Sequence, residues 1–263
     1  MEREGMLCAG VDIGSVATKV VLFGGGKVLG RGLQPTGADP ARAAATAMEA
    51  TLADAGLAAE RPARVVCTGY GRRATQLGGD IVTEISAAAR GAHFLGRPGG
   101  VVSAVLDVGG QDTKVIMVSP EGKVVDFAMN DKCAAGTGRF LSLMAAALEV
   151  DLAQMGELSL RATAPVTVNA TCAVFAESEV VSLIGQGRAK EDIAAGLHAA
   201  IASRVAGMVR QMGQSEIFFM GGAARNIGLR RALENALSAT VYVPPEPQFV
   251  VATGAAVIAA ERT

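Results

Sequence analysis

Two segments of the chain place an aspartate and a glycine where one strand turns into the next. VDIGSVATKVVLF begins at Val11, and LDVGGQDTKVIMV begins at Leu106. A glycine-rich turn exposes backbone N–H groups without a Cβ in the way, which suits close approach to phosphate. An aspartate at the end of the preceding strand can hold hydrated magnesium, because magnesium prefers oxygen ligands and keeps several waters. One such turn alone is more often an ordinary hairpin, but two copies in register, each followed by Thr-Lys, indicate nucleotide binding.

The two segments align residue by residue. Asp12 falls on Asp107, Gly14 on Gly109, and Lys19 on the lysine that follows Thr113. This spacing is longer than the roughly 20–50 residues of solenoid repeats, so it predicts two related domains. The glycine-rich stretch at 96–100 is the natural boundary, which gives domains 1–98 and 99–263. The last helix of the chain is expected to pack back on the first domain.

Each half is predicted to be a three-stranded meander followed by alternating helices and strands, an α/β arrangement. The strand pattern continues at Lys27–Leu33 after the first turn and at Lys123–Phe127 after the second. Helical patterns follow at Pro40–Ala55 and at Thr137–Leu148.

A third glycine motif stands near the end of the chain, in IFFMGGAARNIGLRRAL from Ile217. An apolar strand runs into Gly221 and Gly222, and Asn226 lies where a helix could begin. Alone, this is an ordinary strand, turn and helix. The chain contains no G-x-x-x-x-G-K-[ST] sequence and no G-x-G-x-x-G sequence after a strand, which excludes the two commonest alternative phosphate motifs.

Together these three motifs resemble the superfamily of actin, sugar kinases and heat-shock chaperone ATPases. The resemblance implies a duplicated actin-like ATPase fold, with two ribonuclease-H-like βββαβαβα domains and a nucleotide cleft between them. It also implies that the glycine pair of the third motif lies beside adenosine.

The four cysteines fall into two groups. Cys8 and Cys67 lie in apolar runs and are predicted to be buried in the core, as free cysteine usually is. Cys133 and Cys172 each follow a polar stretch and precede a helical pattern. We therefore expect both of these thiols at helix N-termini, where the helix dipole favours thiolate.

Four-iron clusters usually take four cysteine ligands, and two cysteines in one chain would form only half of such a site. A twofold dimer would supply four ligands. The residues alone leave a second interpretation open, in which Cys133 and Cys172 are buried or helix-capping residues.

Four features of the chain resemble the activator ATPases of 2-hydroxyacyl-CoA dehydratases, a family that includes benzoyl-CoA reductase ATPase subunits. They are the two cysteine segments, MNDKCAAGTGRFL and VNATCAVFAESEVVSLI, the duplicated turn, and TGYGRR from Thr68. This resemblance covers essentially the whole chain. It implies an oxygen-sensitive homodimer whose Cys133 and Cys172 residues hold one [4Fe-4S] cluster. It further implies an ATPase that takes one electron from ferredoxin or flavodoxin and passes it to a dehydratase or reductase.

Roles follow for individual residues. Asp12 and Asp107 are assigned to Mg²⁺, and Gln111 to orienting the attacking water. Lys19 and Lys114 either neutralise phosphate or are exposed strand residues. Asp151 either accepts from ribose hydroxyls or is a surface carboxylate. The contacts to ATP or ADP are otherwise assigned to Gly14, Ser15, Val16, Ala17, Gly109, Gly110, Gly221, Gly222, Ala223 and Gln248.

Composition excludes other classes of protein. The formal net charge is −1 and no basic run is present, so nucleic-acid binding is disfavoured. No run reaches the roughly 18 apolar residues that span a bilayer, and the N-terminal residues lack a signal-peptide pattern, so a cytoplasmic protein is expected. Two rival functions stay open: a kinase of a sugar or carboxylic acid, which would not need the cysteines, and a non-catalytic ATP-dependent assembly switch.

Overall fold

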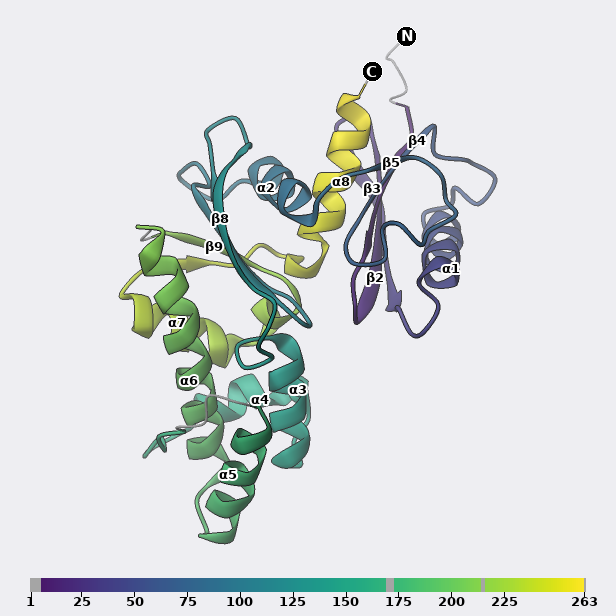
Figure 1. Ribbon diagram of the computed structural model, residues 1–263. Coiled ribbons are helices and arrows are strands. Elements are labelled where there is room, and N and C mark those ends of the chain that lie inside the picture. Colours follow the sequence, from purple (N-terminus) through teal and green to yellow (C-terminus); the bar gives the residue numbers. More distant parts are fainter. Residues whose placement is uncertain (1–5, 169–172, 214–215, 263) are drawn as a thin grey trace. The chain divides into compact units, whose positions relative to one another are not determined.

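The computed structural model divides into two compact units (Figure 1). Unit 1 contains the residues up to Val102, Val118–Val125 and the residues from Gln248 on, whereas unit 2 contains Ser103–Met117 and Asp126–Pro247. Each unit is built on one five-stranded sheet. The structure describes residues 6–168, 173–213 and 216–262.

The sheet of unit 1 has the strand order β3-β2-β1-β4-β5. Its first three strands form the predicted antiparallel meander, and β4 and β5 add to it in parallel. The central strand β1 is buried along its whole length, which explains its nearly continuous apolar sequence. The strands are β1 (Cys8–Ile13), β2 (Ala17–Gly24), β3 (Lys27–Pro35), β4 (Arg64–Thr68) and β5 (Asp80–Ile81).

Two helices cover this sheet, α1 (Pro40–Asp54) and α8 (Val250–Glu261), and a third helix of unit 1, α2 (Glu84–Leu95), packs on α8. The Asp39 side chain caps α1 by accepting from the Arg42 N–H. Helix α8 packs on β1 and lies along α2 (Figure 1). Its approach to β1 needs a glycine, because a Cβ on Gly10 would lie 2.1 Å from the Ala252 carbonyl oxygen.

The sheet of unit 2 repeats this topology. Its order is β8-β7-β6-β9-β10, in which β6 pairs antiparallel with β7 and parallel with β9. The duplication predicted from the sequence is thus confirmed. The third strand of each meander (β3 and β8) and the helices α1 and α3 are confirmed as well. The strands are β6 (Ala104–Val108), β7 (Thr113–Val118), β8 (Val124–Asn130), β9 (Ile217–Met220) and β10 (Val241–Tyr242).

Unit 2 differs from unit 1 in its large helical part, where α3 packs on α4 and α5, and α6 packs on α4, α5 and α7 (Figure 1). Phe140, Met144 and Leu148, the residue after α3, recur at a spacing of four and form its buried side, with exposures of 3%, 0% and 0%. The helices are α3 (Gly138–Ala147), α4 (Leu152–Ser159), α5 (Ala173–Gly185), α6 (Lys190–Gln211) and α7 (Ile227–Leu237), with the short 3₁₀ turn η1 (Gly222–Arg225). A second 3₁₀ turn, η2 (Pro247–Phe249), spans the point where the chain leaves unit 2 for unit 1. Among the described residues, no helix is both long enough and apolar enough to cross a membrane.

Candidate nucleotide and cysteine sites

The two aspartate turns have the same geometry. Asp12 pairs across β1 and β2 with Lys19, and Asp107 pairs across β6 and β7 with Lys114. Each turn is closed by one backbone bond, from the Gly14 N–H to Ala17 at 3.1 Å and from the Gly109 N–H to Asp112 at 2.9 Å. The register explains why aspartate and lysine meet: residues directly opposite in an antiparallel pair project to the same face.

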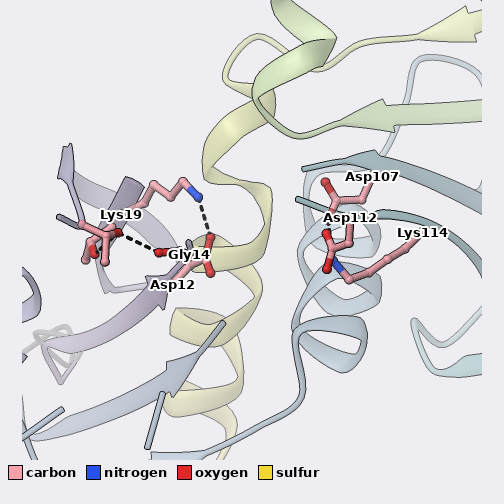
Figure 2. A network of polar contacts seen from close by, with 8 residues as sticks. Asp12, Gly14, Lys19, Asp107, Asp112 and Lys114 are labelled. Carbon is pink, nitrogen blue, oxygen red and sulfur yellow. Dashed lines mark hydrogen bonds and ion pairs between the residues drawn. The ribbon is translucent and has the colours of Figure 1, made fainter. Parts of the chain in front are cut away.

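In unit 1, Asp12 is only 3% exposed and its Oδ2 accepts from Lys19 Nζ at 2.9 Å (Figure 2). Its other oxygen, Oδ1, is buried and has no hydrogen-bond partner among the described residues. A Cβ on Gly69, just after β4, would lie 2.6 Å from that oxygen. An unsatisfied carboxylate oxygen with space kept open beside it fits the water shell of a hydrated Mg²⁺.

In unit 2 the corresponding lysine has two carboxylates. Lys114 is 2% exposed, and its Nζ lies 2.7 Å from Asp112 Oδ1 and 3.7 Å from Asp107 Oδ2 (Figure 2). Both lysines are thus held in ion pairs, so the alternative that they are exposed strand residues is wrong. Asp112 was missed in the sequence analysis. The aligned segments differ at this position, since Ala17 of the first turn matches Asp112 of the second, and this difference could have identified Asp112.

The glycine after β9 repeats the role of Gly69. A Cβ on Gly221 would lie 2.5 Å from Asp107 Oδ1, and its φ of 90° is in the region that favours glycine. Gly69 follows Thr68, the last residue of β4, in the way that Gly221 follows Met220, the last residue of β9. The two positions correspond because Asp12 pairs with Thr68 and Asp107 pairs with Met220. The third motif therefore has a counterpart in the first half that the sequence alignment did not show.

The predicted loop residues differ in accessibility. Val16 is 58% exposed at the tip of the first turn, and Gln111 is exposed at the tip of the second. The other residues of the predicted phosphate loops are half-buried: Gly14, Ser15, Ala17, Gly109 and Gly110. Exposed turn tips leave room for a bound phosphate.

A cavity of about 430 Å³ in unit 2 joins several predicted residues. Gly222, Ala223 and Asp151 line it together, although 70 residues of chain separate the first two from the third. Asp151 caps α4 by accepting from the Ala153 N–H at 2.8 Å, and it remains exposed. A size of this order and a mixed apolar and polar lining suit a nucleoside.

Other residues of this cavity were not singled out as contacts. Asn226 lines it and caps α7 by accepting from the Leu229 N–H at 2.9 Å, which confirms the expected helix start. The remaining lining residues are Gly138, Leu141, Leu152, Ala153 and Arg225. Gln248, by contrast, lies in η2 among the residues of unit 1 and does not line this cavity.

The cysteines of unit 1 are buried, as predicted. Cys8 is 0% and Cys67 1% exposed. Burial raises the pKa of the Cys8 thiol against the opposing effect of the Arg64 charge. Burial raises the pKa of Cys67 to about 11, against a hydrogen bond from Thr75. Both thiols therefore stay neutral and are poor metal ligands.

Cys133 is half-buried, but its predicted place at a helix N-terminus is wrong. Helix α3 begins at Gly138, and Thr137 precedes it as the capping residue. The intervening residues form a separate turn, because the Thr137 N–H and hydroxyl both donate to the Ala134 carbonyl, at 3.0 and 2.7 Å. The positive group beside the sulfur is therefore a guanidinium and not a helix N-terminus: Nη1 of Arg204, on α6, lies 3.5 Å from Cys133 Sγ.

Cys172, the second predicted ligand, lies outside the described residues. Helix α5 begins at the next residue, Ala173. Among the described residues, no group of three or more His, Cys, Asp and Glu side chains is arranged to hold a metal ion.

Comparisons with known proteins agree on one family. The family model described as the BadF/BadG/BcrA/BcrD ATPase family matches residues 9–259. The 2-hydroxyisocaproyl-CoA dehydratase activator of Clostridioides difficile is 39% identical, over 97% of this chain and 95% of the relative. The (R)-2-hydroxyglutaryl-CoA dehydratase activating ATPase of Acidaminococcus fermentans is 40% identical, over 96% of each chain.

Solved structures support the same conclusion. The activator of the 2-hydroxyisocaproyl-CoA dehydratase from Clostridium difficile, with bound ADPNP, superposes with a TM-score of 0.91 at 38% identity, covering 97% of this chain and 95% of that one. A ROK family glucokinase from Streptomyces griseus has a TM-score of 0.59 at 15% identity, covering 97% of this chain and 99% of that one, which shows a shared actin-like ATPase fold and nothing more. The chain belongs to the BadF/BadG/BcrA/BcrD ATPase family.

Proposed function

We propose that this protein is the activator ATPase of a 2-hydroxyacyl-CoA dehydratase or a related reductase, and that it couples ATP hydrolysis to one-electron transfer. The observation that carries the proposal is the Cys133 thiol. It is half-buried and has a guanidinium 3.5 Å away, whereas Cys8 and Cys67 are fully buried. A small-molecule kinase with the same fold would have no use for such a thiol.

The nucleotide half of the proposal uses the two aspartate turns. Asp12 and Asp107 are assigned to the waters of Mg²⁺, and the N–H groups of the turns to phosphate. Their lysines neutralise charge, and Gln111 orients the attacking water from its exposed position. Ion pairs fix the side chains of both lysines and both aspartates before a ligand arrives, so little reorganisation is needed on binding.

The cavity of unit 2 is assigned to the nucleoside. Gly222 and Ala223 leave open backbone for the flat face of adenine, and Asp151 accepts from ribose hydroxyls. Gln248 does not line this cavity and is kept as a separate proposed contact to adenine.

The second half of the proposal gives Cys133 and Cys172 to a [4Fe-4S] cluster shared by two copies of the chain. When bound, such a cluster stores and releases one electron at a time. The donor set fits: each copy supplies two thiols, and Arg204 offsets negative charge at one of them. Four ligands then require a homodimer.

Exposed apolar side chains near the second cysteine support the homodimer. Phe175 is 70% and Val181 59% exposed on α5, the helix that starts directly after Cys172. Val181 and Ile184, which is 37% exposed, lie one turn apart on this helix, and large apolar side chains exposed side by side usually mark a contact surface. A second copy of the chain or the dehydratase would cover them.

Ferredoxin or flavodoxin is proposed as the electron donor, and the cytoplasm as the location, because thiols that hold a cluster need a reducing compartment.

Iron analysis of the anaerobically purified protein tests this function. The wild-type dimer should hold about four irons, on the rule of four cysteine ligands per four-iron cluster. Cys133→Ala should lose the iron and the visible absorbance while retaining nucleotide binding. Cys67→Ala is the matched control and should keep both. An iron-free wild-type dimer with ATP-dependent phosphorylation of a sugar or acid would replace this proposal with the kinase.

A further inference from the structure

One threonine occupies the same place in each half of the molecule. Thr18 pairs with Ile13 across β1 and β2, and Thr113 pairs with Val108 across β6 and β7. Both side chains are buried, at 0% and 1% exposure. Each hydroxyl reaches the connection that leaves the third strand of its meander.

These connections differ in what they carry. In unit 1 the Thr18 hydroxyl bonds to the Thr36 hydroxyl at 3.0 Å, in a connection without cysteine. In unit 2 the Thr113 hydroxyl donates to the Gly136 carbonyl at 2.7 Å, three residues after Cys133. The hydroxyl of the corresponding threonine thus holds the connection in both units, and in unit 2 that connection includes a proposed cluster ligand. We call the hydrogen bond from Thr113 the tether.

Two backbone bonds reinforce the tether in unit 2. The Gly109 carbonyl accepts from the Gly138 N–H at 2.8 Å, and the Gly110 carbonyl accepts from the Arg139 N–H at 3.0 Å. These carbonyls belong to the second aspartate turn, and their donors open α3. The cysteine connection and the turn are therefore held together by three hydrogen bonds.

The geometry of a peptide plane gives this contact a direction. In a trans peptide the C=O and the following N–H point to opposite sides, and no cis peptide is present among the described residues. The carbonyls of Gly109 and Gly110 face the cysteine connection. The N–H groups of Gly110 and Gln111, on the same planes, therefore point away from it. A phosphate bound by those N–H groups would tilt the two peptide planes. The carbonyl groups of the same planes accept hydrogen bonds from the first residues of α3, so the tilt would reach that helix.

We infer that Thr113 is a positioning residue, which couples phosphate contact at 109–111 to the placement of the Cys133 thiol. This inference rests on the proposed nucleotide role of the turn, but not on the presence of a cluster. Phosphate contact shifts the turn, the three bonds carry the shift into residues 133–139, and the thiol changes its exposure. By thermodynamic reciprocity, a group bound at Cys133 changes nucleotide affinity by the same factor.

Alkylation of Cys133 in the full-length, iron-free protein tests the coupling. Iodoacetamide labelling of the Cys133 peptide is followed by mass spectrometry, with and without saturating ADPNP. The wild-type protein should show a rate that changes with ADPNP. Thr113→Val keeps the β-branched shape but removes the hydroxyl, and it should reduce the ADPNP effect by roughly 3- to 10-fold, the range for one buried hydrogen bond. Thr113→Ser restores the hydroxyl and should restore the effect.

Thr18→Val is the matched control, because it removes the corresponding bond from the connection without cysteine. It should leave the ADPNP effect on Cys133 in place. A Thr113→Val protein that keeps the full effect, or a Thr18→Val protein that loses it equally, would overturn the inference.

A wild-type measurement covers the case in which Thr113→Val does not fold. Hydrogen exchange of the protein as purified should show slower exchange at Gly138 and Arg139 when ADPNP is added. Unchanged exchange despite ADPNP binding would refute the coupling and leave the ATPase proposal standing. Absence of ADPNP binding would overturn both.

Discussion

The two aspartate turns began as copies and now differ in charge and in attachment. The first pairs Asp12 with one lysine and has Ala17 beside it, whereas the second adds Asp112 and buries Lys114 between two carboxylates. The connection after the meander is held by Thr36 in one half and includes Cys133 in the other. The shared register preserves the geometry that we propose for phosphate binding, and the half-buried thiol that we propose as a cluster ligand occurs in unit 2.

The largest expected effect tests whether both turns are needed for hydrolysis. Asp107→Ala removes a carboxylate assigned to Mg²⁺, so ATP hydrolysis should fall by roughly 100- to 1,000-fold, the range for loss of one electrostatic contact in a preorganised site. Phosphate release measures this, with the exposed Asp54→Ala as control. If Asp12→Ala has the same effect, the turns contribute equally. Retained activity in Asp107→Ala would refute its assignment.

The buried lysine gives a stability difference between the turns. Lys114→Met removes the cation that two buried carboxylates share, and the free energy of unfolding should fall by about 4 kcal/mol. Lys19→Met should cost less, since it has one carboxylate and an 18% exposed side chain. Urea unfolding of the iron-free protein compares them. Adding Asp112→Ala, which copies Ala17, should recover part of the loss in Lys114→Met. Equal losses for the two lysines would show that the extra carboxylate is immaterial.

Acid should destabilise unit 2 through His198, a buried residue of α6. Burial lowers the pKa of His198 to about 4, from 6.5. The unfolded chain binds a proton below pH 6.5 and the folded chain does not until about pH 4. Stability should therefore fall between these pH values, by about 3 kcal/mol in total. Unfolding of His198→Leu should show a flatter pH profile, whereas a profile identical to that of the wild type would exclude His198 as the cause.

Arg204 gives the smallest expected effect and concerns the cysteine connection alone. A guanidinium near a ligating sulfur stabilises the more negative, reduced form, so Arg204→Met should lower the midpoint potential of the iron-loaded dimer. One hydrogen bond of about 1 kcal/mol corresponds to about 40 mV for one electron. Arg204→Lys should retain part of the shift, and the exposed Arg188→Met serves as control. A potential that is unchanged in Arg204→Met would show that the contact does not influence the redox step.

The sequence predicted the features that the duplication repeats. The duplication was enough to predict both aspartate turns. The pairing of each aspartate with the lysine seven residues later was not predicted, although the hairpin register places the two residues opposite each other. Turn chemistry was harder. The distance between Cys133 and α3 depends on the Thr137 hydroxyl, which closes a turn onto Ala134 instead of extending the helix.

Contacts between distant segments could not be predicted. Arg204 reaches Cys133 from 71 residues away, and the choice of Lys114 between Asp107 and Asp112 depends on distances of 3.7 and 2.7 Å. No periodicity in the sequence encodes either contact. The counterpart of Gly221 at Gly69 was hidden because the residues around them have diverged while the backbone has not.

The packing of α8 on β1 has a consequence for synthesis. The strand that includes Gly10 leaves the ribosome early, but the helix that covers it, around Ala252, leaves late. Until then the central strand of unit 1 lacks one of its apolar covers, and such surface is prone to association. Unit 2, which draws no residue from beyond Pro247, can complete its core first. The half of the molecule that is translated first is thus the half that finishes folding last.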